Sequence, residues 1–236
     1  KEKGYWSGVS PCWLHIFRGY CRRSLFLNQN TGNHNFTRPQ NDIGRGENIS
    51  IMTEGIWSMP MDDIAIDEEL ATQLCKETSI LKPVLAAHQF ENSLETQLSF
   101  LQCLKNDFHI VPICLKKVDF SICKKLSEGI VKALEQTGKI ALINAGSDMT
   151  HFESHRLAEE KDKKTIIKIE NRATLGLYET VRQEQISMCG VNPVTVMLLC
   201  CEKLGAQKAE LIEYKTSGEV NRDKNRMVRH ADVIVI

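Results

Sequence analysis

The string from Gly146 to His151 carries the clearest chemical signature of this 236-residue chain. Asp148 and His151 lie three positions apart, directly after a short apolar run at 140–143 that reads as a buried strand. Open α/β sheets place their sites at the carboxyl ends of strands, so both side chains can converge there on one ligand. A carboxylate and an imidazole together can orient a substrate and move a proton. The structural alternative is that Asp148 caps the next helix and His151 is an ordinary loop histidine, which spacing alone slightly favours.

Cys189 is the second candidate for chemistry. It stands between Ser187 and Gly190, a few residues before the expected helix start at Asn192 and Pro193. Aligned peptide dipoles and free N–H groups at a helix start lower the pKa of a thiol. We therefore predict that Cys189 is the most reactive thiol of the chain, acting as a nucleophile or a metal ligand. A buried, inert thiol is the alternative, and it has about equal weight.

Histidines supply the third element of a possible metal site. His34 follows a predicted strand at 24–27, and His88 precedes a predicted helix at 91–105. An imidazole, a thiolate and an Asp/His pair, each placed after a strand or at a helix start, can form a mononuclear transition-metal site. The other histidines have no companion ligand at useful spacing and are interpreted as structural: His15, His109, His155 and His230.

Apolar periodicity predicts the elements that must position these residues. The predicted strands are 24–27, 49–53, 59–66, 108–113, 140–143, 209–214 and 227–236. The predicted helices are 68–77, 91–105, 120–136, 153–171, 174–184 and a last apolar helix that Asn192 caps and Gly205 ends. We expect 49–53 to pair with 59–66 and the last two strands to complete the sheet. This alternation predicts a three-layer α/β fold, with helices on both faces of a central, largely parallel or mixed sheet.

Composition narrows the classes of partner and the setting. Thirty basic and thirty acidic residues cancel, so no long-range field favours nucleic acid or an anionic membrane. No apolar run is long enough to cross a membrane. Nine cysteines without a CxxC pair suggest a reducing, cytoplasmic setting. Residues 1–48 hold seven basic and three acidic residues and read as a divergent, truncated N-terminal part of one single domain, whose regular α/β part is 49–236.

Several strings together resemble the MEMO family, whose bacterial and archaeal members are often called AmmeMemoRadiSam system protein B. They occur in the family's order throughout 49–236. The strings are Ser50-Ile51-Met52-Thr53-Glu54-Gly55, Ile66-Asp67-Glu68-Glu69-Leu70-Ala71, Glu91-Asn92-Ser93-Leu94-Glu95-Thr96-Gln97-Leu98, Asp107-Phe108-His109-Ile110-Val111-Pro112, Gly146-Ser147-Asp148-Met149-Thr150-His151 and Ile186-Ser187-Met188-Cys189-Gly190.

The resemblance implies a fold like that of the class III extradiol dioxygenases, which hold nonhaem iron at the carboxyl edge of a mixed sheet. Carried over by motif, Cys189 matches the family's cysteine, Asp148 and His151 match its Asp/His pair, and His34 matches a ligand histidine. The implied site is a cleft in which His34, Cys189 and His151 bind iron or copper, with Asp148 and His151 as the acid/base pair. The implied activity is that of a nonhaem metal-dependent oxidoreductase.

The chain also departs from the family pattern. The family's Pro-His-Ala-Gly-Tyr string is reduced to Gly4-Tyr5 with Glu2 in the place of the histidine, and Asn92 stands where the family usually has histidine. Family members usually have Gly-Tyr where Arg229 and His230 stand. Asparagine cannot titrate or ligate like an imidazole. The alternative function is therefore a noncatalytic protein that binds a small molecule or peptide at a degenerate metal site.

Overall fold

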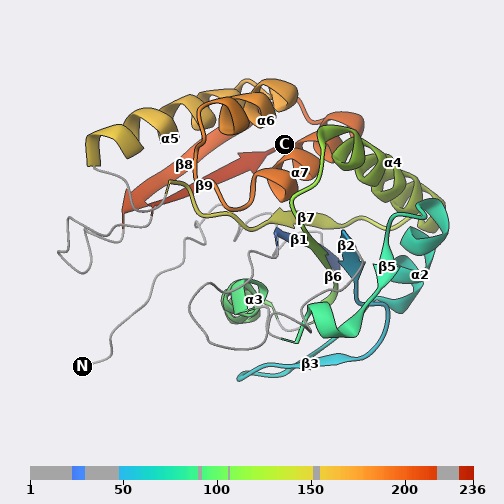
Figure 1. Cartoon of the computed structure of the whole chain (residues 1–236). Helices are drawn as coiled ribbons and strands as arrows, with labels where there is room; N and C mark the ends of the chain where they lie inside the picture. The colour runs from blue at the N-terminus through green and yellow to red at the C-terminus, as the bar shows by residue number, and fades with distance from the viewer. Residues whose placement is uncertain (1–22, 30–47, 90–91, 106, 151–154, 217–228) are drawn as a thin grey trace, which may run out of the picture.

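The computed structural model describes most of the chain, and the elements are labelled in Figure 1. The described residues are 23–29, 48–89, 92–105, 107–150, 155–216 and 229–236. Two predicted site residues, His34 and His151, lie outside these ranges. No helix in the described ranges is both long and apolar enough to cross a membrane.

A mixed five-stranded sheet forms the centre of the fold, in the order β5-β2-β6-β1-β7. Its strands are β1 (Arg23–Gln29), β2 (Ile49–Ile51), β5 (Lys82–Pro83), β6 (His109–Leu115) and β7 (Leu142–Ala145). Strand β1 pairs in parallel with both β6 and β7, while β2 runs antiparallel to β6. The parallel strands β6, β1 and β7 therefore share one carboxyl edge, as a mixed sheet was expected to provide.

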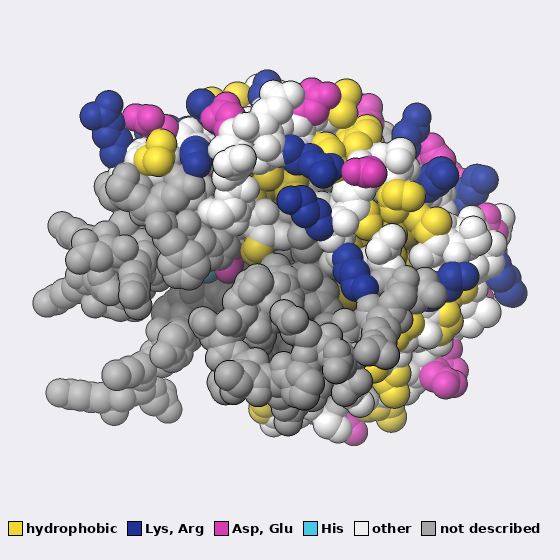
Figure 2. All heavy atoms as spheres, in the orientation of Figure 1, with side chains coloured by type: hydrophobic (Ala, Val, Ile, Leu, Met, Phe, Trp, Pro, Cys, Tyr) yellow, Lys and Arg dark blue, Asp and Glu magenta, His cyan; other side chains and the backbone are white. Residues whose placement is uncertain are grey.

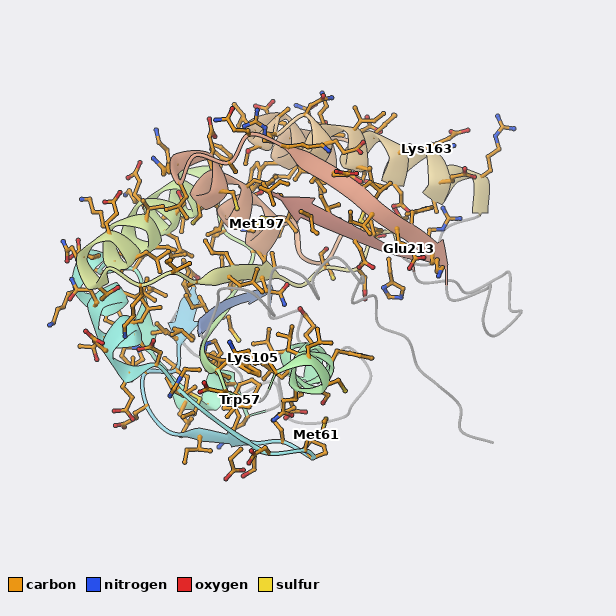
Figure 3. The ribbon with its side chains drawn as sticks, turned by 180° about the vertical axis from the view of Figure 1, so that it is seen from behind. Trp57, Met61, Lys105, Lys163, Met197 and Glu213 are labelled. Atoms are coloured by element: carbon orange, nitrogen blue, oxygen red, sulfur yellow. The ribbon has the colours of Figure 1, made fainter. Side chains whose placement is uncertain are left out.

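Two strand pairings differ from the prediction. Strand β2 does not pair with the following apolar stretch, which instead folds on itself as a hairpin of β3 (Ile56–Ser58) and β4 (Asp63–Ala65). Pro60 and Asp62 supply a turn inside the predicted strand 59–66, which explains the error. The hairpin lies beside helix α3, where Gln102 Nε2 donates to the Asp62 carbonyl at 2.7 Å, and Figure 3 shows Trp57 and Met61 on it.

The last two strands also differ from the prediction, because they do not join the central sheet. Strands β8 (Ala209–Thr216) and β9 (Arg229–Val235) pair only with each other, antiparallel, among the described strands. Val233 and Val235 pack against the apolar cluster formed by helices α5, α6 and α7. This separate ribbon lies under α5 (Figure 1) and brings β9 next to the loop that follows β7.

The helices largely follow the predicted ranges. They are α2 (Glu68–Glu77), the 3₁₀ turn η1 (Leu85–Ala87), α3 (Asn92–Leu104), α4 (Phe120–Thr137), α5 (His155–Glu170), α6 (Thr174–Gln183) and α7 (Val191–Lys203). Asp67 caps α2, accepting the Leu70 N–H at 3.1 Å, a role that a carboxylate fills well at a helix start. Gly138 ends α4 in the left-handed conformation, which glycine adopts without a steric penalty.

The start of α7 is a correction to the prediction. Gly190 takes the N-cap position and Val191 is the first helical residue, so Asn192 lies inside the first turn. The buried Asn192 side chain donates to the Val118 carbonyl at 2.9 Å instead of capping its own helix. The Asn192 side chain therefore binds a neighbouring segment of the chain and does not cap α7.

Helix α7 is central, in keeping with its apolar composition. It packs on α4 and α6 and also contacts β1 and β7. In Figure 1 helix α3 lies on the other side of the sheet from α7. The surface in Figure 2 mixes positive and negative side chains over its described part, in keeping with the zero net charge.

Candidate functional site

The site begins where β7 ends and the chain enters the loop 146–150. The parallel strand β7 delivers this loop to the carboxyl edge, and the segment before α7 comes up against it. The Asp148 backbone N–H donates to the Cys189 Sγ at 3.0 Å, and the Gly190 N–H donates to the Ser147 Oγ at 2.9 Å. The structure thus brings the Asp148 backbone and the Cys189 thiol into direct hydrogen-bond contact.

The close approach of the two segments depends on Gly190. A Cβ atom at this position would lie 2.3 Å from the Gly146 carbonyl oxygen and 2.4 Å from the Ser147 Cβ. Both distances are far shorter than a van der Waals contact of about 3.5 Å. Only glycine lets the Cys189 sulfur reach the Asp148 amide.

The Cys189 thiol is half-buried, and its environment differs from the predicted one. Burial raises the pKa of this thiol, the nearby Asp148 carboxylate raises it further, and the Asp148 N–H bond opposes both effects. The prediction of a lowered pKa is wrong, because desolvation outweighs the helix start. Among the described cysteines Cys103 is the exposed one, so it replaces Cys189 as the thiol that we expect to react first.

His230 is a site residue that the sequence reasoning missed. Its Nδ1 lies 3.3 Å from the Asp148 Oδ1, and both side chains are roughly one-third to two-fifths exposed, at 34% and 41%. The interpretation of His230 as structural without a companion is therefore wrong. Sequence spacing could not show this contact, because 82 positions separate the two residues and β9 was assigned to the central sheet.

The polar face of the β8–β9 ribbon continues away from His230. Asp232 faces Glu213 across the two strands, and His230 faces Lys215. Burial and the Glu213 carboxylate raise the pKa of the Asp232 carboxyl to about 6, while His230 and Lys215 act in the opposite direction. Directly opposed carboxylates are destabilising in a ladder, and Lys215, whose Nζ lies 2.7 Å from the Glu213 Oε1, offsets part of this repulsion.

His88 lies elsewhere, against the end of strand β6. It is buried, and its Nδ1 lies 3.4 Å from the Cys114 Sγ. Its Nε2 has no hydrogen-bond partner among the described residues, and burial lowers its pKa to about 4. The structure shows no contact between His88 and the Asp148 and Cys189 pair.

His88 makes the free energy of unfolding depend on pH in the acid range. Because the folded pKa of about 4 lies below the ordinary value of 6.5, the neutral form is favoured by folding. Its stabilising effect is complete above about pH 6.5 and is lost as pH falls towards 4. We expect a loss of about 2 kcal/mol in the free energy of unfolding between roughly pH 7 and pH 5 from this residue alone.

Urea unfolding of the wild type and of a His88→Gln variant at both pH values measures this effect. The variant is expected to lack that part of the pH slope. Asp232 has the opposite sign, because its raised pKa stabilises the fold at low pH, but it is present in both proteins and cancels in the difference. Parallel pH slopes for the two proteins would contradict the expectation.

The fit of these residues to a metal ion can be judged from the donor set. The thiol of Cys189 is a soft ligand that suits Fe(II) or Cu(I), and the neighbouring Asp148 supplies a carboxylate. No group of three His, Cys, Asp or Glu side chains in the described ranges is arranged to hold a metal ion. The thiol and the carboxylate are thus suitable ligand types for a transition metal, but among the described residues they form only part of a ligand set.

Taken together, fold and site define a class of mixed α/β proteins with a thiol–carboxylate site at the carboxyl edge of the central sheet. Residues 39–234 match the family described as Memo-like protein. The chain is 34% identical to a MEMO1 family protein of Methanopyrus kandleri over 195 residues, which is 82% of this chain and 69% of the relative. It therefore belongs to the MEMO family.

Further relatives support the same family assignment. A MEMO1 family protein of Methanocaldococcus jannaschii is 37% identical over 199 residues, covering 83% of this chain and 69% of the relative. One of Methanosarcina barkeri is 38% identical over 196 residues, covering 83% and 73%. Strand β1 lies before the matched range but occupies a position inside the central sheet.

Proposed function

We propose that this protein binds iron or copper at the carboxyl edge of its sheet, with Cys189 as the thiolate ligand. His34 and His151, which match ligand positions of the family, would complete the set. The observation that supports the proposal is the 3.0 Å bond from the Asp148 N–H to the Cys189 Sγ, because it fixes the thiol beside the Asp/His motif. A dioxygenase-like three-layer fold and a cytoplasmic, reducing setting belong to the same proposal.

The ion, when bound, supplies one-electron redox chemistry, and the chain's own residues supply the rest. Asp148 holds or moves a proton next to the ligand set. His230 keeps the Asp148 carboxylate in place through the 3.3 Å contact. The Asp148 N–H bond would stabilise the Cys189 thiolate, which is the form of this side chain that would hold the ion.

Metal binding is expected to be weak. The family's Pro-His-Ala-Gly histidine is missing, and a site with fewer strong ligands holds a transition metal less firmly. Burial, which raises the pKa of Cys189, adds a further cost, since a proton must leave before the ion binds. We therefore expect substoichiometric metal after dialysis.

A second candidate function is the noncatalytic binding of a small molecule or peptide at the same edge. Two observations favour it: the raised pKa of the Cys189 thiol and the engagement of Asp148 with His230. In this case the site keeps its shape but not its redox chemistry. Metal binding distinguishes the two candidates directly.

Cu(I) competition titration under anaerobic conditions is the decisive experiment. The wild type is expected to withdraw only part of the Cu(I) from a weak chromogenic chelator, in keeping with weak binding, and Cys189→Ala is expected to bind at least about tenfold more weakly, because it loses the thiolate. Cys103→Ser, which removes an exposed thiol, serves as the matched control and is expected to bind like the wild type. Equal affinity in wild type and Cys189→Ala would refute the proposal and leave the noncatalytic function.

A further inference from the structure

A buried carboxylate on α5 anchors the loop that carries Asp148. Asp162 is fully buried, and its Oδ1 accepts two hydrogen bonds from Thr150, one from the backbone N–H at 3.0 Å and one from the hydroxyl. Thr150 is itself buried at the end of the loop 146–150. Charge-assisted bonds of this kind are the stronger ones, so this end of the loop is tied to α5.

The other oxygen of Asp162 is tied to the β8–β9 ribbon. The Tyr214 hydroxyl donates to Asp162 Oδ2 at 2.7 Å and accepts from Arg229 Nη1 at 3.0 Å. Arg229 is buried with 1% exposure, and its Nη1 lies 3.6 Å from Asp162 Oδ2. The hydroxyl of Tyr214 therefore connects the carboxylate to the guanidinium and completes the hydrogen bonding of a buried ion pair.

Strand β9 then returns to the same loop. The Arg229 carbonyl accepts the Met149 N–H at 2.9 Å, and the next residue, His230, contacts the Asp148 carboxylate. Figure 3 labels Lys163 on α5 and Glu213 on β8, which are the sequence neighbours of Asp162 and Tyr214. The loop is thus held at Asp148, Met149 and Thr150 by one connected set of residues.

We infer that Asp162, Tyr214 and Arg229 are positioning residues for the site, holding the loop 146–150 against Cys189. The inference rests on the proposed function only in taking Cys189 and Asp148 as the site. A buried ion pair contributes little net stability compared with apolar packing of similar volume. Here the ion pair fixes a specific loop geometry. Asp162 accepts two hydrogen bonds from Thr150, and Arg229 belongs to strand β9, which contacts Met149 and Asp148.

Tyr214→Phe tests the inference with the smallest possible change. Removal of the hydroxyl that joins Asp162 to Arg229 is expected to favour local opening of the loop, which exposes the Cys189 thiol. We expect the alkylation rate of Cys189 by iodoacetamide, mapped by mass spectrometry, to rise about tenfold. The exposed Cys103 provides an internal reference whose rate stays constant.

Tyr178→Phe is the matched control. The Tyr178 side chain is buried and its hydroxyl donates to the Val118 carbonyl at 2.8 Å, an acceptor outside the network of Asp162, Tyr214 and Arg229. Both variants lose a tyrosine hydroxyl that donates a hydrogen bond, and both are expected to lose thermal stability. Only Tyr214→Phe is expected to raise the alkylation rate of Cys189. An equal rise in both variants, or no rise in either, would overturn the inference.

Thr150 gives a second test that does not depend on either tyrosine. Thr150→Val removes the hydroxyl bond to Asp162 and is expected to accelerate Cys189 alkylation as Tyr214→Phe does, whereas Thr150→Ser keeps the hydroxyl and the wild-type rate. Fast alkylation in both Thr150 variants would contradict the inference. These rates are measured without metal, so a failure of Cu(I) binding leaves them unaffected and the two proposals can fail separately.

Discussion

Arg229→Met is expected to lower the free energy of unfolding by about 3–5 kcal/mol, the range found when one partner of a buried ion pair is removed. Asp162 is fully buried and Arg229 is 1% exposed, so water cannot replace the lost guanidinium. Methionine has a similar length and keeps the apolar contacts of the stem. The cost therefore comes from the unpaired Asp162 carboxylate and from the Tyr214 hydroxyl that loses its donor.

Urea denaturation of a double-mutant cycle measures this effect. Asp162→Asn on the Arg229→Met background removes the buried charge, so the double variant is expected to be more stable than Arg229→Met alone. Lys203→Met is the control on an exposed pair, in which Nζ lies 3.8 Å from Glu128 and both side chains are more than one-third exposed. We expect less than about 0.5 kcal/mol there. Additive losses in the cycle would contradict the ion-pair explanation.

The sequence predicted the local elements well, because their signals are local. Asp67 caps α2 as its position before an apolar helix indicates, and α4 ends at Thr137, one residue beyond its predicted end. The position of Asp148 after β7 was likewise readable, since strand ends and sites coincide in α/β sheets. Hydrophobic periodicity and cap residues predict a helix or strand from its own residues, whichever segment it later packs against.

Pairing between distant segments could not be predicted in the same way. The β8–β9 ribbon has the apolar alternation of a strand pair, but alternation does not say which sheet the pair joins. His230 was therefore separated from Asp148, although β9 brings them to 3.3 Å. The buried network of Asp162, Tyr214 and Arg229 was missed for the same reason, because it joins α5, β8 and β9 across long sequence separations.

The pKa of Cys189 shows a second limit of sequence reasoning. A helix start favours a thiolate, and α7 does begin just after Cys189. Desolvation depends on the segments that cover the thiol, however, and here the loop 146–150 lies against it. Only the packed structure sets the balance between these effects.

Gly190→Ala is expected to lower the free energy of unfolding by about 3 kcal/mol, at the upper end of the usual cost of overpacking. Gly190 has a φ of −100°, which alanine adopts readily, so backbone strain contributes nothing. The cost arises because the new methyl group would lie 2.3 Å from the Gly146 carbonyl oxygen. The loop and the Cys189 segment must separate, which also breaks the Asp148 N–H bond to the sulfur.

Gly176→Ala in helix α6 is the control for the same chemical change. Its added methyl group would meet the Lys168 Cδ at 3.5 Å, an ordinary contact, so we expect a gain of about 0.5–1 kcal/mol from the better helix former. Ser147→Gly on the Gly190→Ala background removes the Ser147 Cβ but leaves the Gly146 carbonyl in place. Thermal and urea unfolding should therefore show at most partial rescue, and full rescue would mean that a side-chain clash, rather than the backbone contact, keeps position 190 a glycine.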